Sequence, residues 1–389
     1  MTRHYLDHAS ASPLRPGAFE AMVPFLRDHH ADPGRLHAEG RVTRVALETA
    51  REQVAALVGA RPREVVFTSG GTEAANAAVH GAIARAVERG GTPHVVLGAI
   101  EHSCVREAAE RSAAHLGGSI TVVGCDGEGI VDPIALADAV RSDTALVALQ
   151  VANHEVGSIQ PVAGAVLAVR EAAARCGAAP LVLADAASAV GHLPVDLAAL
   201  GVDLGVVSAH KFGGPKGAGA MYVRRGLRVP PLVLGGAQER ARRAGVEDVA
   251  AMVGFGAAAA EVAGTLTTEA SRNGAQTDRI AADATALAGV VRVGPSDPTL
   301  RLPHLVCLTV EGVEAEPILL ALDQRGIAVH SGSACSSETL EPSPVLLAMG
   351  ADADRSLRVS VGWDTTEADA AAFGPAFADA LGALRSLRG

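Results

Sequence analysis

Short runs of apolar and β-branched residues recur along the first part of the chain. Runs of this length and composition are typical of buried strands. The runs are Val65–Thr68, Val95–Leu97, Ile120–Val123, Leu146–Val151, Leu181–Ala184, Leu204–Ser208 and Ala220–Val223. We expect each of them to form a strand of one sheet.

Helical patterns lie between several of these predicted strands. In one of them, apolar residues three and four positions apart build a single apolar face: Leu47, Ala50, Val54, Leu57 and Val58. Strands that alternate with helices favour a mostly parallel sheet wrapped by helices. The fold class predicted is therefore α/β.

The length of the chain allows two domains or one large α/β unit. With 389 residues, 49% of them hydrophobic, the chain can bury a large core. We expect a second domain to begin near Ala257, after a helix rich in glycine and alanine. We place a large domain at residues 13–256, and a smaller α+β domain at residues 1–12 and 257–389.

Polar and glycine-rich residues follow the predicted strands directly. They are Ser69-Gly70-Gly71-Thr72, Glu101-His102, Asn153-His154-Glu155, Asp185 and His210-Lys211. In an open α/β sheet, ligands bind at the edge formed by the carboxyl ends of the strands. We therefore expect these residues to share one site.

Charge and composition exclude some classes of partner. The net charge is -10 and only 3% of the residues are aromatic. These values argue against a nucleic-acid partner, because nucleic-acid binding needs clustered positive charge and aromatic rings for stacking. No membrane surface is implied either. The N-terminus has no apolar run that resembles a signal peptide, so we expect a cytoplasmic protein. The five cysteines are widely spaced and suggest neither a disulfide framework nor a zinc site.

Only two of the 33 basic residues are lysines, Lys211 and Lys216. A primary amine can form an imine with an aldehyde, which a guanidinium cannot do. Compositional bias is the alternative explanation. The surrounding stretch from Ser208 to Gly217 favours a lysine that forms an imine over compositional bias. Ser208 and His210 offer hydrogen-bond donors on a glycine-rich turn, which can hold a phosphate beside the amine.

Two further features suit a phosphorylated, ring-containing cofactor. Gly71 and Thr72 lie where a strand passes into a helix, a position that can bind phosphate, although a Thr-Glu helix start is also ordinary capping. Asp185 ends an apolar strand and could pair with a protonated pyridine nitrogen; the alternative is a turn or N-cap aspartate.

One cysteine stands among small residues. Cys335 lies within Ser331–Ser337, a segment of serine, glycine and alanine that is typical of an accessible loop. A reactive thiol needs such access and an activated thiolate. The remaining cysteines lie in apolar or helical contexts typical of packing residues: Cys104, Cys125, Cys176 and Cys307.

Taken together, these motifs resemble the cysteine desulfurases, which are enzymes of the class-V aminotransferase type that depend on pyridoxal 5′-phosphate (PLP). The resemblance covers nearly the whole chain. It rests on Tyr5–His8, Thr68–Glu73, Glu101-His102, Asn153–Gly157, Asp185-Ala186, Ala209–Lys211, Arg243–Gly245, Ser331–Cys335 and Leu357–Ser360. It implies the fold-type-I architecture of PLP-dependent transferases and a homodimer with sites near the subunit boundary.

The resemblance also implies roles for single residues. Lys211 would carry the cofactor as a Schiff base, Asp185 would pair with the pyridine nitrogen, and His102 would stack on the ring and assist proton transfer. The phosphate would be held by Gly71, Thr72, Ser208 and His210.

The substrate implied is L-cysteine. Arg358 would bind its carboxylate, Asn153 would also bind the substrate, and Cys335 would take its sulfur as a persulfide and leave alanine. The Ser-Gly-Ser-Ala-Cys form resembles the subgroup that passes the persulfide to a sulfur-acceptor protein. The pathway served, such as iron–sulfur cluster assembly or tRNA thiolation, is not indicated by the sequence.

Three positions depart from the family pattern. His154 replaces an asparagine, Ser188 replaces a glutamine, and Val246 replaces a threonine. In the family the first two contact the region of the cofactor's ring hydroxyl, and the third reaches the phosphate from the partner subunit. His154 and Ser188 keep a hydrogen-bonding group there, whereas Val246 does not.

Other activities remain open on the sequence alone. One is a PLP-dependent C–S lyase, in which Cys335 would be dispensable, and another is a selenocysteine lyase. A third is a non-catalytic scaffold with a degraded cofactor site, which the presence of Lys211, Asp185, His102 and Arg358 disfavours.

Overall fold

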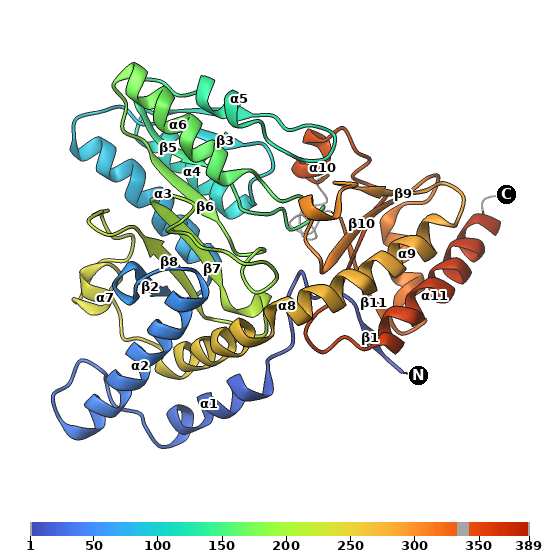
Figure 1. The fold of residues 1–389 in the computed structure, drawn as a ribbon, viewed down its shortest axis with the longest axis horizontal. Coiled ribbons are helices and arrows are strands. Elements are labelled where there is room, and N and C mark those ends of the chain that lie inside the picture. Colours follow the sequence, from blue (N-terminus) through green and yellow to red (C-terminus); the bar gives the residue numbers. More distant parts are fainter. Residues whose placement is uncertain (1, 333–341, 388–389) are drawn as a thin grey trace.

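The computed structural model describes residues 2–332 and 342–387. A large and a small sheet dominate it, and the long helix α8 (Val249–Thr285) runs from one to the other (Figure 1). The large sheet has the strand order β2-β8-β7-β6-β5-β3-β4. Its strands are β2 (Val65–Thr68), β3 (His94–Gly98), β4 (Ser119–Val123), β5 (Thr144–Ala148), β6 (Leu181–Asp185), β7 (Leu204–Ser208) and β8 (Gly219–Val223).

The large sheet is mostly parallel, as predicted. Strands β4, β3, β5, β6 and β7 pair in parallel, and only β8 runs antiparallel to its neighbours β7 and β2. Every predicted run forms a strand of this sheet. The run that we expected to end at Val151 leaves β5 at Ala148, but Leu149 and Val151 still donate their N–H groups to Leu183 O and Asp185 O.

Helices cover both faces of the large sheet because alternate side chains of each strand point to opposite sides. Val95 and Leu97 face one core, and Val96 between them faces the other. The first core is closed by α3 (Gly71–Glu88) and α4 (Ser103–His115). The second is closed by α2 (Ala38–Leu57), α5 (Pro133–Asp138), α6 (Val162–Cys176) and the first half of α8, against which α1 (Pro16–Arg27) packs.

The small sheet is antiparallel and has its own core. Its strands, in the order β12-β13-β10-β9, are β9 (Val290–Val293), β10 (Leu305–Val310), β12 (His330–Ser331) and β13 (Ser356–Ser360). The helices beside it are α9 (Ala315–Asp323), α10 (Pro344–Ala348) and α11 (Glu367–Ser386). Strand β1 (His4–Tyr5) pairs with β11 (Ile327–Ala328), so the N-terminal segment joins this part of the molecule. The remaining short segments are η1 (Pro62–Glu64), η2 (Ala209–Lys211), η3 (Pro298–Leu300) and α7 (Gln238–Ala241).

Helix α8 contributes to both cores. Phe255 and Val262 are buried against the large sheet, and Ile280 and Ala284 against the small one. By length and composition α8 is apolar enough to cross a membrane, but 56% of its most apolar window is buried inside the protein. Because α8 passes residue 257 without a break, the domain limits at 12/13 and 256/257 stay a prediction.

A buried ion pair fastens α2 to the segment that follows β8. Arg51 Nη1 and Nη2 each lie 2.6 Å from a carboxylate oxygen of Glu239. Glu239 also accepts the Phe67 N–H at 2.9 Å, and the Arg51 guanidinium lies over the Phe67 ring. Glu239 has φ 47°, a left-handed conformation that is unfavourable for a residue with a side chain. The ion pair holds it in place.

Candidate active site

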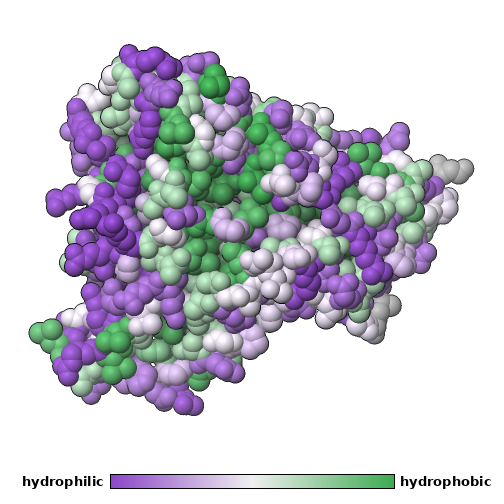
Figure 2. All heavy atoms as spheres, viewed as in Figure 1, coloured by the Kyte–Doolittle hydropathy of each residue, from purple (hydrophilic) through white to green (hydrophobic). Residues whose placement is uncertain are grey.

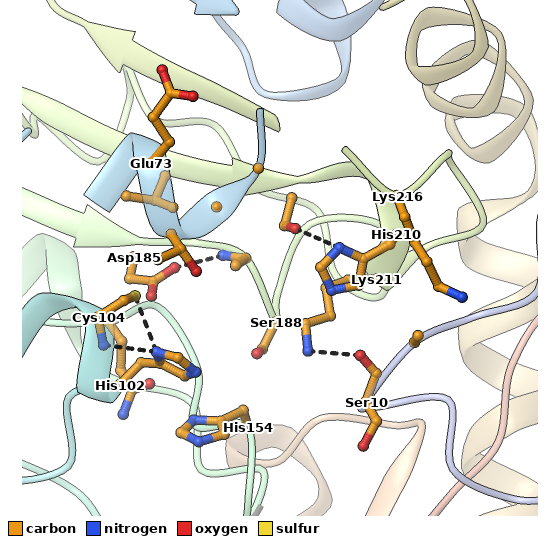
Figure 3. A pocket seen from close by; sticks show the side chains of 18 of the residues that line it. Ser10, Glu73, His102, Cys104, His154, Asp185, Ser188, His210, Lys211 and Lys216 are labelled. Carbon is orange, nitrogen blue, oxygen red and sulfur yellow. Dashed lines mark hydrogen bonds between the residues drawn. The ribbon is translucent and has the colours of Figure 1, made fainter. Parts of the chain in front are cut away.

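A cavity of about 440 Å³ opens at the carboxyl edge of the large sheet, where the sequence places the site. Figure 3 shows side chains from several loops pointing into it. The predicted residues that line it are Gly71, Thr72, His102, His154, Asp185, Ser188, Ser208, His210 and Lys211. The structure thus brings these residues together in one cavity, whereas Glu101, Asn153 and Glu155 of the same strand ends do not line it.

Lys211 lies in η2, directly after β7, and its amine faces the N-terminal segment. Nζ donates hydrogen bonds to Ala9 O at 2.7 Å and to Ser10 O at 3.2 Å, the second of which is drawn in Figure 3. The chain's other lysine, Lys216, lines the same cavity. Both primary amines of a chain otherwise rich in arginine therefore lie at one site.

One end of the cavity suits an anion. The N-terminus of α3 begins at Gly71, where an added Cβ would lie 3.1 Å from Ser208 Cβ, so glycine permits the close approach of helix and strand. Exposed N–H groups at a helix N-terminus bind anions. Ser208 Oγ lies 3.0 Å from His210 Nδ1. Burial, together with Lys211 and Lys216, lowers the pKa of His210 to about 4, so its ring is neutral at neutral pH.

A carboxylate stands across the cavity at the end of β6. Asp185 Oδ1 accepts the Ala187 N–H at 2.9 Å. The neighbouring Glu101 is buried, and its Oε1 accepts the Gln150 N–H at 2.6 Å. Burial and, to a lesser extent, the charge of Asp185 raise the pKa of Glu101 to about 8. Glu101 therefore holds a proton at neutral pH, and Asp185 lies beside a neutral acid.

His102 is the N-cap of α4, which fixes the position of its proton. Nδ1 accepts the Cys104 N–H at 3.1 Å, so a neutral ring carries its hydrogen on Nε2. The Cys104 Sγ lies 3.0 Å from the same Nδ1. His102 thus offers a hydrogen-bond donor at Nε2.

A second imidazole, that of His154, lies beside His102. The ring centroids are 4.8 Å apart and the planes are tilted by 57°. His154 Nε2 lies 3.4 Å from Glu155 Oε1. One of the three positions at which the sequence departs from the family therefore carries an imidazole beside a carboxylate.

Arg358 is buried behind the wall of the cavity, on β13. Its Nη1 donates to His154 O at 2.9 Å, and its Nη2 donates to Ser10 Oγ at 2.7 Å and to Asp7 Oδ1 at 3.1 Å. Its Nε has no hydrogen-bond partner among residues 2–332 and 342–387. Arg358 therefore touches two cavity residues without lining the main cavity itself.

Asn153 is fully buried and shapes the loop that carries His154. Its Oδ1 accepts the N–H groups of Glu155 and Val156 at 2.8 and 2.9 Å, and its Nδ2 donates to Ile100 O at 3.3 Å. A direct contact of Asn153 with substrate stays a prediction. Cys335, the predicted sulfur acceptor, lies outside the described residues.

Sequence reasoning missed some residues of the cavity. Ser10 and Ala11 line it from the N-terminal segment, which the sequence places beside the small domain. Gln150 was also missed, and Cys104 lines the cavity although its helical context suggested packing alone. A polar residue directly after a strand can be predicted to line the site from its local sequence. A residue that reaches the cavity from a distant segment of the chain has no such local pattern.

A cluster of buried histidines lies behind Lys211. The rings of His192 and His304 stack with centroids 3.4 Å apart and planes 11° from parallel. His192 Nε2 lies 3.1 Å from Lys211 O. Burial lowers the pKa of His192 to about 4 and that of His304 well below its usual range, so both rings are neutral at neutral pH. They join the large sheet's loops to the small sheet without adding charge.

The geometry agrees with comparisons to known proteins. The family described as Aminotransferase class-V matches residues 4–373. The chain belongs to the class-V aminotransferases. One curated relative is Cysteine desulfurase IscS of Dictyoglomus turgidum, 40% identical over 369 residues that cover 94% of this chain and 91% of the relative.

Solved structures place the fold of this class-V aminotransferase among similar enzymes. A NifS-like protein superposes with a TM-score of 0.90 at 29% identity, covering 98% of this chain and all of that one. A structure described as SspA in complex with cysteine gives a TM-score of 0.79 at 28% identity, covering 92% of this chain and 98% of that one. The predicted fold class is confirmed.

The cavity of this class-V aminotransferase fits PLP, the cofactor that the family implies. The α3 N-terminus and Ser208 are the groups that would hold the phosphate. Asp185, facing the same cavity, offers the carboxylate that a pyridinium nitrogen needs, and Lys211 offers the amine that an aldehyde needs. The phosphate, the pyridine nitrogen and the aldehyde of PLP would thus each meet a complementary protein group.

Proposed function

We propose that this chain is a PLP-dependent cysteine desulfurase that takes sulfur from L-cysteine onto Cys335 and releases L-alanine. The observation that carries the proposal is the shared cavity, into which the amine of Lys211 and the carboxylate of Asp185 both face. The desulfurase relative at 40% identity supports the same activity.

Four kinds of group hold the cofactor in this proposal. Bound PLP supplies an electron-withdrawing ring that acidifies the substrate Cα–H. Asp185 keeps the pyridine nitrogen protonated, and the α3 N-terminus with Ser208 and His210 binds the phosphate. Ser188 and His154 line the cavity where the ring hydroxyl is expected. Lys211 forms the covalent bond to the cofactor.

Substrate binding and proton transfer fall to three further residues. Arg358, whose Nε is left without a hydrogen bond in the described part of the chain, attracts the α-carboxylate, while Asn153 supports the adjoining loop. Lys211 Nζ, once released from the cofactor, would be the base that takes the Cα proton. His102 Nε2–H would be the donor for the substrate carbon that loses its sulfur.

The sulfur step needs one thiol. The Cys335 thiolate attacks the sulfur of the substrate, an S–S bond forms, and the substrate C–S bond breaks with its electron pair left on carbon. That carbon takes up a proton, so the products are alanine and a persulfide on Cys335, with no external oxidant or reductant. We propose a sulfur-acceptor protein as the next carrier, and a cytoplasmic location.

The test is to identify the carbon product formed from L-cysteine. With PLP and a thiol reductant, we expect L-alanine from the natural protein, none from Cys335→Ala, and a normal yield from Cys176→Ala, which removes an exposed cysteine. Mass spectrometry distinguishes the products. Pyruvate from both the natural protein and Cys335→Ala would mean a C–S lyase, and no product from either would mean a different substrate or a scaffold.

We also propose that the chain works as a homodimer. Large apolar side chains are exposed along α1, α2 and their connection, and in the loop after β8: Phe19, Leu26, Leu36, Val42, Val45 and Leu234. Figure 2 shows hydrophobic residues over the end of the molecule formed by α1 and α2. A second copy that covers them would remove apolar surface from water. Val246 is 64% exposed and does not line its own chain's main cavity, as expected for a position that reaches a partner's site.

Replacing Val246 with threonine tests this arrangement. A hydroxyl that reaches the phosphate of the partner's site would lower the dissociation constant for PLP by about tenfold. Fluorescence titration measures it, and light scattering should give twice the mass of one chain. Val122→Thr, at an exposed position on β4, is the control and should leave PLP affinity unchanged. A monomer in solution, or equal effects of the two substitutions, would contradict the proposal.

A further inference from the structure

A second cavity, of about 890 Å³, lies at the edge of the large sheet opposite the candidate active site. The antiparallel pair β2 and β8 runs between the two cavities. Ser69 and Gly217, beside one end of this pair, line the main cavity, whereas Glu64 and Val223, at the other end, line the second one. A four-residue strand such as β2 is roughly 13 Å long. The second cavity is therefore separate from the site proposed for PLP.

Guanidinium groups dominate the lining of this second cavity, which we call the arginine cavity. It is lined by two glutamates, Glu48 and Glu64, and by six arginines: Arg61, Arg63, Arg224, Arg225, Arg240 and Arg242. The chain as a whole has a net charge of -10, so positive charge gathers here against the overall balance. Like charges that lie within a Debye length, about 8 Å at physiological salt, repel one another unless an anion lies between them.

Glu64 holds two arginine-bearing segments in place. Its Oε2 accepts the Arg61 N–H and its Oε1 accepts the Arg225 N–H, both at 2.8 Å. These two hydrogen bonds join η1 to the segment that follows β8. Both carboxylate oxygens thus bind main-chain N–H groups, and Glu64 forms no ion pair with either guanidinium within residues 2–332 and 342–387. Glu64 therefore orders the lining while the two side chains stay available to a ligand.

Only part of the positive charge is compensated by carboxylates of the chain. Arg224 pairs with Asp203 at 2.8 Å, and Arg240 pairs with Glu48 at 3.0 Å. In the described part of the chain the other arginines of the cavity have no carboxylate partner: Arg61, Arg63, Arg225 and Arg242. Burial and the neighbouring charge of Arg240 lower the pKa of Arg242. An anion that enters the cavity would relieve this repulsion.

We propose that the arginine cavity binds an oligophosphate anion of nucleotide size. A guanidinium donates paired hydrogen bonds to phosphate oxygens and keeps its charge at neutral pH. The volume of the cavity lies in the range of sites for small molecules. Pro62 and Leu227, both half-buried, add apolar surface that the uncharged part of such a ligand can cover. The inference goes beyond the proposed desulfurase activity and does not depend on it.

The test is calorimetric titration of the holoenzyme, whose PLP site is occupied, with ATP, tripolyphosphate and AMP in magnesium-free buffer of low salt. We expect ATP and tripolyphosphate to bind saturably and AMP to bind at least about tenfold more weakly, because AMP has one phosphate group. The double variant Arg63→Ala with Arg225→Ala should raise the dissociation constants for ATP and tripolyphosphate about tenfold or more. The visible absorbance of the cofactor should stay unchanged throughout.

A matched variant separates this site from a general effect of net charge. Arg175→Ala with Arg355→Ala removes two exposed arginines elsewhere on the chain and should bind both anions as the natural protein does. Tighter binding of ATP than of tripolyphosphate would identify a nucleotide as the ligand, and equal binding would identify the phosphate chain alone.

Three results would overturn the inference: no saturable binding of either anion, equal weakening in the two double variants, or AMP bound as tightly as ATP. Arg63→Gln with Arg225→Gln serves in the same comparison if the alanine variant does not fold. The two proposals fail separately, since anion binding is measured without turnover and alanine formation from L-cysteine is measured without the anion.

Discussion

Lys211→Ala lowers the rate of alanine formation by about three orders of magnitude or more, and it abolishes the visible absorbance band of lysine-bound cofactor. The reason is that the variant loses both the covalent attachment of the cofactor and the base for the Cα proton. Nζ of Lys211 is the primary amine that the loop after β7 holds against Ala9 O and Ser10 O. Spectroscopy and a product assay measure the two losses.

Lys216→Ala is the matched control for this substitution. Lys216 lines the same cavity and is the only other lysine of the chain. We expect the Lys216→Ala protein to keep the visible band and, after reduction with borohydride, to carry the cofactor mass on the peptide that contains residue 211. A visible band that survives in Lys211→Ala but disappears in Lys216→Ala would reverse the assignment of the two amines.

Glu239→Gln is expected to lower the free energy of unfolding by about 3–5 kcal/mol, because it leaves the buried guanidinium of Arg51 without its counter-charge. The same carboxylate accepts the Phe67 N–H and stabilises a left-handed backbone at position 239. Urea unfolding followed by circular dichroism measures the change.

An exposed ion pair provides the comparison for this effect. Arg141→Ala breaks the contact with Asp143 at the surface and should change the free energy of unfolding by less than about 1 kcal/mol. The double variant Arg51→Met with Glu239→Leu should recover part of the stability lost in Glu239→Gln, because it removes both charges from the interior. Similar losses for Glu239→Gln and Arg141→Ala would contradict this account of the buried pair.

The sequence predicted the strands of the large sheet well because their signal is local. The run from Leu181 to Ala184, for instance, is buried on both faces, so each of its residues is apolar. The cavity residues at the strand ends followed from the same runs, since a polar residue directly after a buried strand of a parallel sheet lies at the ligand-binding edge. Asp185 and Lys211 were found in this way.

The parts that could not be predicted depend on contacts between distant segments. No local pattern announces that Glu239 pairs with Arg51, or that the carbonyl groups of Ala9 and Ser10 meet the amine of Lys211. The tautomer of His102 depends on the N–H of Cys104, which lies in place only once α4 has formed. The family resemblance supplied roles for Lys211 and His102, but the contacts around these two residues are visible only in three dimensions.

The continuous helix α8 has a mechanical consequence for the enzyme. The first half of α8 packs beside the sheet that carries Lys211, and its last turns pack beside the sheet that carries Arg358. Arg15 adds a brace, because its guanidinium binds Glu261 and Glu269 on α8 and lies over the Trp363 ring near the small sheet. A relative rotation of the two sheets therefore has to bend a single helix and stretch this brace. The helix and the Arg15 contacts therefore resist such rotation. The distance between the Lys211 amine and the Arg358 guanidinium is set when the protein folds.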